Sequence, residues 1–201
     1  MKNGQDPSTD NPDVKRFEQW AATYDQSILQ KLFFEPIHAG MLTLLVNVSF
    51  TEPPGCIIDI GCGTGRLLKT ASVRWPEAKV YGVDPAENMV SRAAQLNPRA
   101  TFQIGTAEAL PFQGSTADLA MSSLSFHHWA DQTRGVHEIA RVLRPGGWFC
   151  LVDHTFFLAR LFGDRVKSRA QVRALITEAG LYVRQQHWFW IPYILITLAQ
   201  K

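Results

Sequence analysis

The chain has few cysteines and no spacing that would bring them together. Its three cysteines, Cys56, Cys62 and Cys150, are odd in number, widely spread and without a C-x-x-C pair. This excludes a disulfide-built scaffold and gives no reason to expect a zinc site. We therefore expect a cytoplasmic protein that needs no metal.

Long hydrophobic runs and strong charge are also lacking. The longest apolar run, 188–199, contains Pro192 and falls short of the ~20 residues that span a bilayer. Residues 1–13 are polar and lack the apolar core of a signal peptide. A formal net charge of +2 with 19% charged residues gives no bulk attraction to polyanions. We expect a soluble protein that acts on small molecules, without nucleic acid as a partner.

A glycine-rich turn is the most informative feature that is present. The apolar stretch 56–60 predicts a buried strand, and the D-x-G-x-G-x-G pattern of 59–65 predicts a tight turn that opens a helix. Such a turn lets a ligand lie against backbone N–H groups, although an ordinary strand-to-helix turn has the same glycines. A dinucleotide fingerprint needs a third glycine where Arg66 stands. A nicotinamide oxidoreductase is therefore disfavoured, and a different nucleoside-like cofactor is expected.

Hydrophobic periodicity predicts alternating strands and helices, hence a mostly parallel sheet covered on both faces. The predicted strands are 56–60, 79–83, 100–104, 118–122 and 148–152, with helices at 65–73, from Pro85 onward and at 131–143. Two helices precede the first strand, one running from Val14 to Ile28 and one following Pro36. At 201 residues the chain fits one domain, 14–201, with a flexible tail at 1–13 and a helical region at 14–50.

The C-terminal part of the chain, from residue 168 onward, does not continue the alternation of single strands and helices. Ser168 and Gln171 have the spacing of a capping box, and Gly180 provides a helix stop. Two apolar stretches follow, 181–188 and 193–199, separated by a short connection that contains Pro192. We expect them to pair as an antiparallel hairpin.

Five motifs in this order resemble the class I S-adenosylmethionine (SAM)-dependent methyltransferases, in particular the small-molecule (type 11) group that methylates quinone precursors. The motifs lie at 59–65, 81–84, 105–112, 117–129 and 143–147. The resemblance implies a Rossmann-like three-layer α/β sandwich with a seven-stranded sheet of order 3-2-1-4-5-7-6, an antiparallel seventh strand and an N-terminal helical lid. It also implies SAM as cofactor, S-adenosylhomocysteine as product, a small, partly apolar methyl acceptor, and a monomer or homodimer.

The resemblance also implies where the cofactor lies. The expected contacts are Tyr24, Asp59, Gly61, Cys62, Gly63, Asp84, Pro85, Met89, Thr106, Ala107, Glu108, Ser122 and Ser123. Asp84 would accept hydrogen bonds from the ribose hydroxyls, or cap the next helix, or do both. Asp59 would serve the amino group of the ligand through water or by ordering the loop, or would simply cap the turn. Met89 would pack on the adenine or belong to the core.

Thr106 departs from the family, which has an aspartate there, so only backbone contacts with adenine are expected from 106–108. Ser122 and Ser123 should line the methionine side of the ligand, because ligands collect at the carboxyl ends of strands. Tyr24 would provide an aromatic face near the sulfonium, with a place in an ordinary apolar helix stripe as the alternative.

Two adjacent histidines follow the fourth predicted strand, beside the expected point of methyl transfer. A neutral imidazole can remove a proton from an acceptor, so we predict that His127 or His128 is a general base. The alternative is that they shape the substrate wall or cap the next helix. His154, after the fifth strand, is a weaker candidate for the acceptor pocket. A SAM-binding partner or sensor without catalysis is the alternative function.

Overall fold

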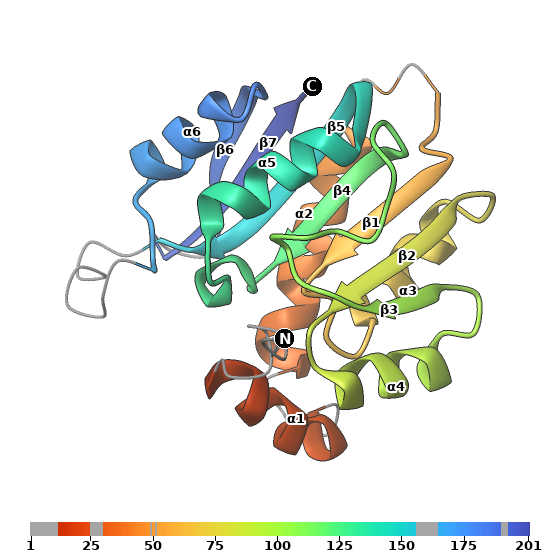
Figure 1. The fold of residues 1–201 in the computed structure, drawn as a ribbon. Coiled ribbons are helices and arrows are strands. Elements are labelled where there is room, and N and C mark those ends of the chain that lie inside the picture. Colours follow the sequence, from red (N-terminus) through yellow and green to blue (C-terminus); the bar gives the residue numbers. More distant parts are fainter. Residues whose placement is uncertain (1–11, 25–29, 49, 51, 156–164, 190–192) are drawn as a thin grey trace, which may run out of the picture.

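The computed structural model describes residues 12–24, 30–48, 50, 52–155, 165–189 and 193–201. Its centre is one seven-stranded sheet of order β3-β2-β1-β4-β5-β7-β6 (Figure 1). The strands are β1 Cys56–Ile60, β2 Lys79–Asp84, β3 Thr101–Ile104, β4 Ala117–Ser123, β5 Leu143–His154, β6 Tyr182–Phe189 and β7 Ile194–Gln200. Strands β1 to β5 pair in parallel, and β7 is antiparallel to both β5 and β6. The predicted order and the C-terminal hairpin are confirmed.

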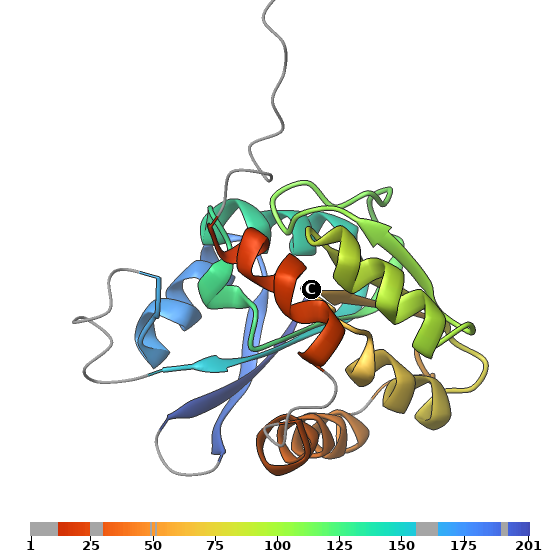
Figure 2. The same cartoon turned by 90° about the horizontal axis from the view of Figure 1, so that it is seen from below.

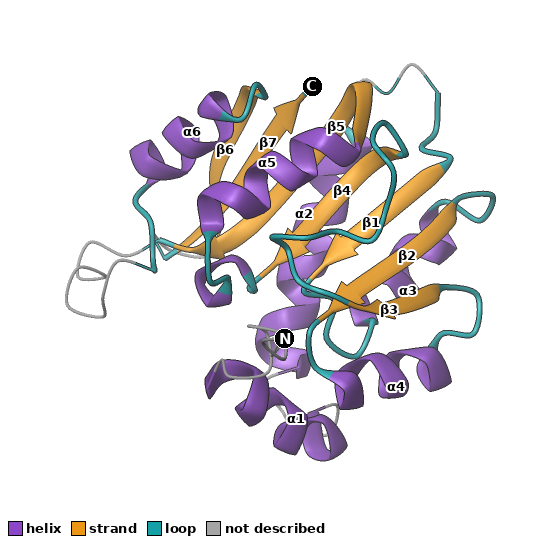
Figure 3. Ribbon diagram, in the orientation of Figure 1, coloured by secondary structure: helices purple, strands orange, loops and turns teal. Residues whose placement is uncertain are grey.

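Helices cover both faces of the sheet (Figure 3). They are α1 Pro12–Tyr24, the π-helical turn η1 Gln30–Phe34, α2 Glu35–Val46, α3 Arg66–Arg74, α4 Glu87–Leu96, the 3-10 turn η2 Phe126–His128, α5 Gln132–Val142 and α6 Arg169–Glu178. The predicted tail residues 1–11 and Ile28 lie outside the described residues, whereas Pro12 and Asp13 belong to α1. The capping box of Ser168 with Gln171 is present as predicted.

Two hydrophobic cores lie on opposite faces of the sheet, and β1 contributes to both. All five residues of β1 are buried, because successive side chains of a strand point to opposite faces and both faces are covered. Ile58 packs in the core that includes residues of α5 and α6. Ile57 packs in the core that includes residues of α2 and α3. The strand is therefore held on both sides, which fixes the position of the turn that follows it.

The helix after β2 begins later than the sequence suggested. Its N-cap is Ala86, and its first residue is Glu87 rather than Pro85. The reason is a local turn in which the Asp84 Oδ1 atom accepts a hydrogen bond from the Ala86 backbone N–H at 3.0 Å. Asp84 is therefore not the N-cap, and its carboxylate lies at the end of β2.

Helix α1 crosses the edge of the sheet at which the parallel strands end, and it lies beside α4 (Figures 1 and 2). Val14, Phe17 and Ala21 of α1 pack against Ala86 and Met89. That α1 serves as the lid implied by the resemblance stays a prediction.

A carboxylate of α1 also caps α4. Both Glu18 carboxylate oxygens accept hydrogen bonds from α4, one from the backbone N–H of Glu87 and the other from that of Asn88 at 2.9 Å. The first amides of a helix lack partners within the helix and attract negative charge. Glu18 therefore fastens α1 to α4.

We expect Glu18→Ala to loosen α1 from α4. The first amides of α4 lose their acceptor, and loss of a helix cap costs about 1 kcal/mol. Hydrogen exchange should therefore speed up across residues 12–24, with little change in the central strands. Glu178→Ala removes an exposed glutamate at the end of α6 and serves as the control. Unchanged hydrogen-exchange rates in α1 of the Glu18 variant would show that apolar packing alone holds α1 against α4.

Candidate functional site

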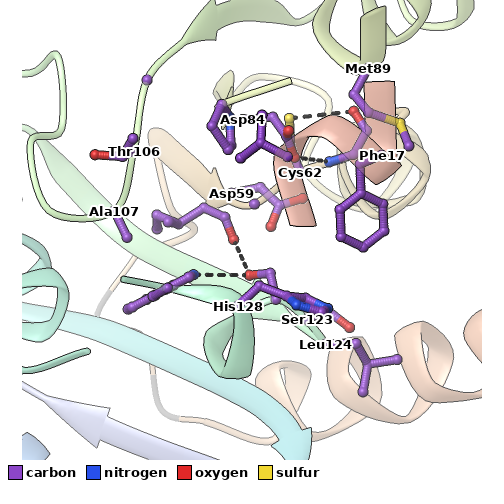
Figure 4. A pocket seen from close by; sticks show the side chains of 18 of the residues that line it. Phe17, Asp59, Cys62, Asp84, Met89, Thr106, Ala107, Ser123, Leu124 and His128 are labelled. Carbon is purple, nitrogen blue, oxygen red and sulfur yellow. Dashed lines mark hydrogen bonds between the residues drawn. The ribbon is translucent and has the colours of Figure 1, made fainter. Parts of the chain in front are cut away.

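A pocket of about 510 Å³ lies at the edge of the sheet where β1, β2 and β4 end. Its wall includes residues 59–64 at the end of β1, Asp84 and Pro85 at the end of β2, residues 105–109 after β3, and 123–125 at the end of β4. Val14 and Phe17 of α1 cover it, and Met89, His128 and residues 129–131 complete much of the wall. Figure 4 shows Asp59 and Asp84 between Met89 on one side and Ser123 and His128 on the other. The structure thus gathers most of the predicted site residues in one cavity.

The turn after β1 has the backbone conformation that its glycines predicted. Gly61, Gly63 and Gly65 have φ angles of +72°, +51° and +75°, which side-chain-bearing residues rarely adopt. The backbone N–H groups of Gly61 and Cys62 donate to the Val83 carbonyl at 2.8 and 3.1 Å. The turn is therefore bonded to β2. A Cβ atom on Gly63 would meet no atom within 4 Å, so this glycine faces open space.

Asp84 joins the ends of β1 and β2. Its Oδ2 accepts a hydrogen bond from the Gly63 N–H at 2.9 Å, and its Oδ1 accepts one from Ala86 N–H. A carboxylate can accept about four hydrogen bonds, so each oxygen can still accept one from a ligand. Burial raises the pKa of Asp84 to about 6, although the two backbone hydrogen bonds oppose this shift. Its carboxylate is ionised at neutral pH and lines the pocket.

Asp59 lines the same pocket without a partner for one of its oxygens. The side chain is buried, and its Oδ1 atom has no hydrogen-bond partner among the described residues. Burial, and next the nearby charge of Asp84, raise the pKa of Asp59 to about 8. Burying an unpaired acceptor is costly. A cationic or hydrogen-bond-donating ligand would remove that cost.

The unfolding free energy of the ligand-free protein should fall as pH rises towards 8. The folded state holds the Asp59 proton up to about pH 8, whereas an unfolded chain releases it near pH 4. A rising pH therefore favours the unfolded chain, by up to about 1.4 kcal/mol per pH unit. Asp84 contributes in the same direction only up to about pH 6. His38, whose folded pKa is lowered to about 4, contributes in the opposite direction up to about pH 6.5. The interval from pH 7 to 8 therefore reports on Asp59.

Urea unfolding at several pH values from about 7 to 8 measures this slope. Asp59→Asn should flatten it, since an amide does not titrate. Asp118→Asn, at the opposite end of the sheet, should keep the slope because Asp59 is intact. An equal slope in the Asp59 variant would mean that other groups cause the pH dependence.

The residues expected beside adenine lie along one side of the pocket. Thr106, Ala107 and Glu108 all line it. The Glu108 side chain accepts a hydrogen bond from the Asp131 N–H at 3.0 Å, which ties this loop to the start of α5. Met89 is 1% exposed and belongs both to the pocket wall and to the small core beneath α1. The two interpretations of Met89 from the sequence are therefore compatible.

Of the two serines at the end of β4, only one lines the pocket. Ser123 is part of the wall, and its Oγ is buried without a partner among the described residues. Ser122 is fully buried and bonded instead to the Ser125 hydroxyl at 2.8 Å. The expectation for Ser122 is corrected, because neighbouring residues of a strand face opposite sides.

Sequence reasoning missed Ser125, which connects several parts of the wall. Its hydroxyl donates to the Ile60 carbonyl at 3.0 Å and accepts from the Trp129 indole N–H at 3.3 Å. A Cβ on Gly61 would lie 2.3 Å from this hydroxyl oxygen. The only available signal was its place just beyond a predicted strand.

The aromatic candidates differ in their position. His128 lines the pocket, with its ring edge-on to Phe17 at 5.1 Å between centroids. His127 is not part of that wall, and its ring instead meets Asp153. The side chain of Tyr24 lies outside the described residues, so its predicted contact stays a prediction. Phe17, which precedes it in α1, faces the pocket (Figure 4).

Near α2 the pocket is bounded by His38 of α2 and by Phe34, the last residue of η1. Leu124 and Arg66, from other parts of the chain, also line it. Burial, and then the charge of Arg66, lower the pKa of His38 to about 4. The imidazole is therefore neutral. Arg66 forms an ion pair with Glu35 of α2. None of these residues was predicted from the sequence to line the site.

Comparison with known proteins identifies a similar family. Residues 58–151, just under half of the chain, match the family model described as a methyltransferase domain. This part of the chain is therefore similar to methyltransferases. Its match begins in β1 and ends in β5, and so it includes the glycine turn, Asp84 and both candidate histidines.

Individual relatives agree with this assignment. The uncharacterized methyltransferase YcgJ of Bacillus subtilis is 33% identical over 130 residues, which are 62% of this chain and 49% of that protein. The malonyl-[acyl-carrier protein] O-methyltransferase of Methylococcus capsulatus is 32% identical over 172 residues, 82% of this chain and 60% of the relative. This chain thus spans less than two thirds of either protein.

The fold of this chain also matches a solved structure. A SAM-dependent methyltransferase from Aquifex aeolicus superposes with a TM-score of 0.73 at 19% identity, covering 91% of this chain and 97% of that one. Within the described ranges, no helix is long and apolar enough to cross a membrane.

Proposed function

We propose that this protein transfers a methyl group from SAM to an oxygen, carbon or nitrogen of a small, partly apolar molecule. The observation that carries the proposal is the pair of carboxylates on either side of the glycine turn. Asp59 and Asp84 line one pocket, and Asp59 Oδ1 is buried without a partner among the described residues. That arrangement suits a ligand with an amino group at one end and ribose hydroxyls at the other.

The residues of the pocket fit the parts of SAM. Asp84 would accept hydrogen bonds from the ribose hydroxyls, and Asp59 would accept one from the amino group. Met89 and the backbone of 106–108 would enclose the adenine. Ser123 would donate on the methionine side, with Gly61, Cys62, Gly63 and Pro85 in close contact. The Ser123 hydroxyl, which has no hydrogen-bond partner in the described part of the chain, supports this placement independently of the two acidic side chains.

The chain needs little chemical machinery for this reaction. When bound, SAM supplies a methyl group that its sulfonium has already activated. The protein then has to hold the acceptor in line with that group and exclude water. Phe17, Phe34 and Leu124 give the pocket apolar walls, which suits a partly apolar acceptor. His128, which lines the pocket, or His127 beside it would take the proton that the acceptor loses.

Two measurements test the proposal. Calorimetry should show binding of SAM and of S-adenosylhomocysteine, and none of NAD. Radiolabelled SAM, incubated with the protein and a host metabolite extract, should then label a small product whose mass spectrum identifies the methylated atom. Binding without any labelled product would favour a SAM-binding partner or sensor. Binding of NAD in place of SAM would overturn the proposal.

A further inference from the structure

A buried carboxylate outside the pocket wall holds His127 by two different atoms. Asp153 lies near the end of β5 and is 4% exposed. Its Oδ2 accepts a hydrogen bond from the backbone N–H of His127 at 2.8 Å, and its Oδ1 lies 2.7 Å from the ring Nδ1. The Oδ1 atom also accepts from the backbone N–H of His154 at 2.6 Å. One carboxylate thus fixes both the main chain and the ring of His127.

This contact determines the form of the imidazole. An ionised carboxylate only accepts hydrogen bonds, so the proton of a neutral His127 ring lies on Nδ1. The other ring nitrogen, Nε2, then carries a lone pair. Rotation of the ring would break the contact with Asp153. His127 is therefore presented as a base in one orientation, which is how a buried aspartate orients the histidine of hydrolytic triads.

The cluster adjoins the proposed cofactor pocket. The His127 ring centroid lies 3.9 Å from that of His128, which lines the pocket. The His127 ring centroid is also 5.2 Å from that of His154, whose ring is stacked on Phe33 at 6.2 Å. Phe33 precedes the pocket residue Phe34 in the sequence. The three imidazoles therefore form one cluster, which reaches the pocket wall at His128.

We propose that Asp153 and His127 form an acid–base dyad, in which Asp153 is a positioning residue and His127 Nε2 receives the proton of the methyl acceptor. The inference rests on the proposed function. In the reaction, a bond forms between the acceptor atom and the methyl carbon while the sulfur–methyl bond breaks, and sulfur keeps that electron pair. The acceptor proton passes to Nε2 and later to solvent. Asp153 stabilises the imidazolium in the meantime.

The surroundings of the dyad favour this role. Burial, and the neighbouring His127, lower the pKa of His154, with Asp153 opposing the shift. His154 is therefore neutral at neutral pH and does not compete for the charge of Asp153. His127, Asp153 and His154 each offer a ligand atom within 4.8 Å of the others, which is also compatible with a metal ion. However, the Asp153 oxygens already face three N–H groups, and this favours the dyad.

The tautomer of His127 can be measured without any acceptor. Nitrogen-15 NMR of the imidazoles should show a protonated Nδ1 and an unprotonated Nε2 for His127, assigned by loss of the signals in His127→Asn. In Asp153→Asn the amide has one acceptor oxygen for three N–H groups, so this tautomer should no longer dominate. Asp118→Asn, which changes a carboxylate that accepts from Gly55 and Cys56 N–H groups, should leave the spectrum unchanged. A protonated Nε2 in the native protein would overturn the dyad.

Kinetics test whether Asp153 acts through His127. Using the acceptor found in the labelling assay, His127→Asn and Asp153→Asn should each lower kcat about 100-fold or more. The double variant should be no slower than His127→Asn alone. Affinity for SAM should stay within about twofold, and Asp153→Glu should recover part of the activity. His137→Asn on α5 and Asp118→Asn serve as controls, because they make the same substitutions at a histidine and an aspartate outside the dyad.

Several outcomes would overturn the dyad. Independent, additive losses in the double variant, or a lowered melting temperature with unchanged kcat in the folded Asp153 variant, would make Asp153 merely structural. Loss of activity with a chelator and recovery with a divalent cation would make the cluster a metal centre. A native protein that binds SAM but methylates nothing refutes the proposed function, and the base role with it. Slow methyl transfer that is confined to the His127 and Asp153 variants is the expected result, and it agrees with both the proposed function and the base role.

Discussion

Asp84→Asn is expected to weaken SAM binding about 100-fold while the protein remains folded. The variant keeps the size of the side chain but has one acceptor oxygen instead of two. Gly63 N–H and Ala86 N–H already occupy one site on each oxygen of Asp84, so the amide would leave at most one ribose hydroxyl with an acceptor. Hydrogen bonds to a charged group contribute about 1.5–3 kcal/mol each, and 1.4 kcal/mol is tenfold in affinity. Calorimetric titration with SAM measures the loss.

The control for Asp84 is Asp118→Asn. Asp118 also accepts two backbone hydrogen bonds, from Gly55 and Cys56, at the start of β4. It is therefore a similar carboxylate at the opposite edge of the sheet from the pocket. SAM affinity should be unchanged in this variant. Equal affinities in both variants and the native protein would refute the ribose role of Asp84.

Gly61→Ala is expected to destabilise the protein by about 3 kcal/mol and to abolish detectable SAM binding. Two costs combine. The φ angle of +72° costs an L-residue about 1–2 kcal/mol. In addition, the new Cβ would lie 2.3 Å from Ser125 Oγ and 2.4 Å from Ser125 Cβ, so Ser125 must move from its bonds to Ile60 and Trp129, at a cost of about 1–3 kcal/mol.

Urea unfolding and calorimetry measure both effects for Gly61. Gly146→Ala is the matched control, because Gly146 has a φ angle of +81° but no atom within 4 Å of its Cβ position. It should lose only the conformational part, about 1–2 kcal/mol, and keep its SAM affinity. Similar losses in the two variants would mean that the contact with Ser125 is unimportant.

The glycine turn and the order of the elements were predictable because both depend on short segments. The strand 56–60 was placed at its exact bounds, and the turn required glycines whose φ angles the structure shows to be positive. The beginning of α4 was misplaced because the side chain of Asp84 formed its own turn with Ala86. A local hydrogen bond here competed with the preference of proline for the first helical position.

The features that the sequence did not predict share a different property, because each depends on contacts between distant parts of the chain. Glu18 caps a helix whose amides lie 69 and 70 residues away. Asp153 meets His127 across 26 residues. Ser122 and Ser123 are neighbours in sequence, yet only Ser123 lines the pocket. No local pattern states which of two adjacent serines faces a cavity, because this depends on how the sheet is covered.

The sequence by itself determined the alternation of strands and helices, the turn that can approach a ligand, and the acidic residues at the ends of β1 and β2. Those features follow from backbone preferences and hydrophobic periodicity, which act within a few residues. Only the tertiary structure decided that Asp59 keeps an oxygen without a partner among the residues that the structure describes, that Glu18 caps α4, and that Asp153 fixes His127. Burial and hydrogen-bond geometry between distant segments exist only once the sheet has brought those segments together.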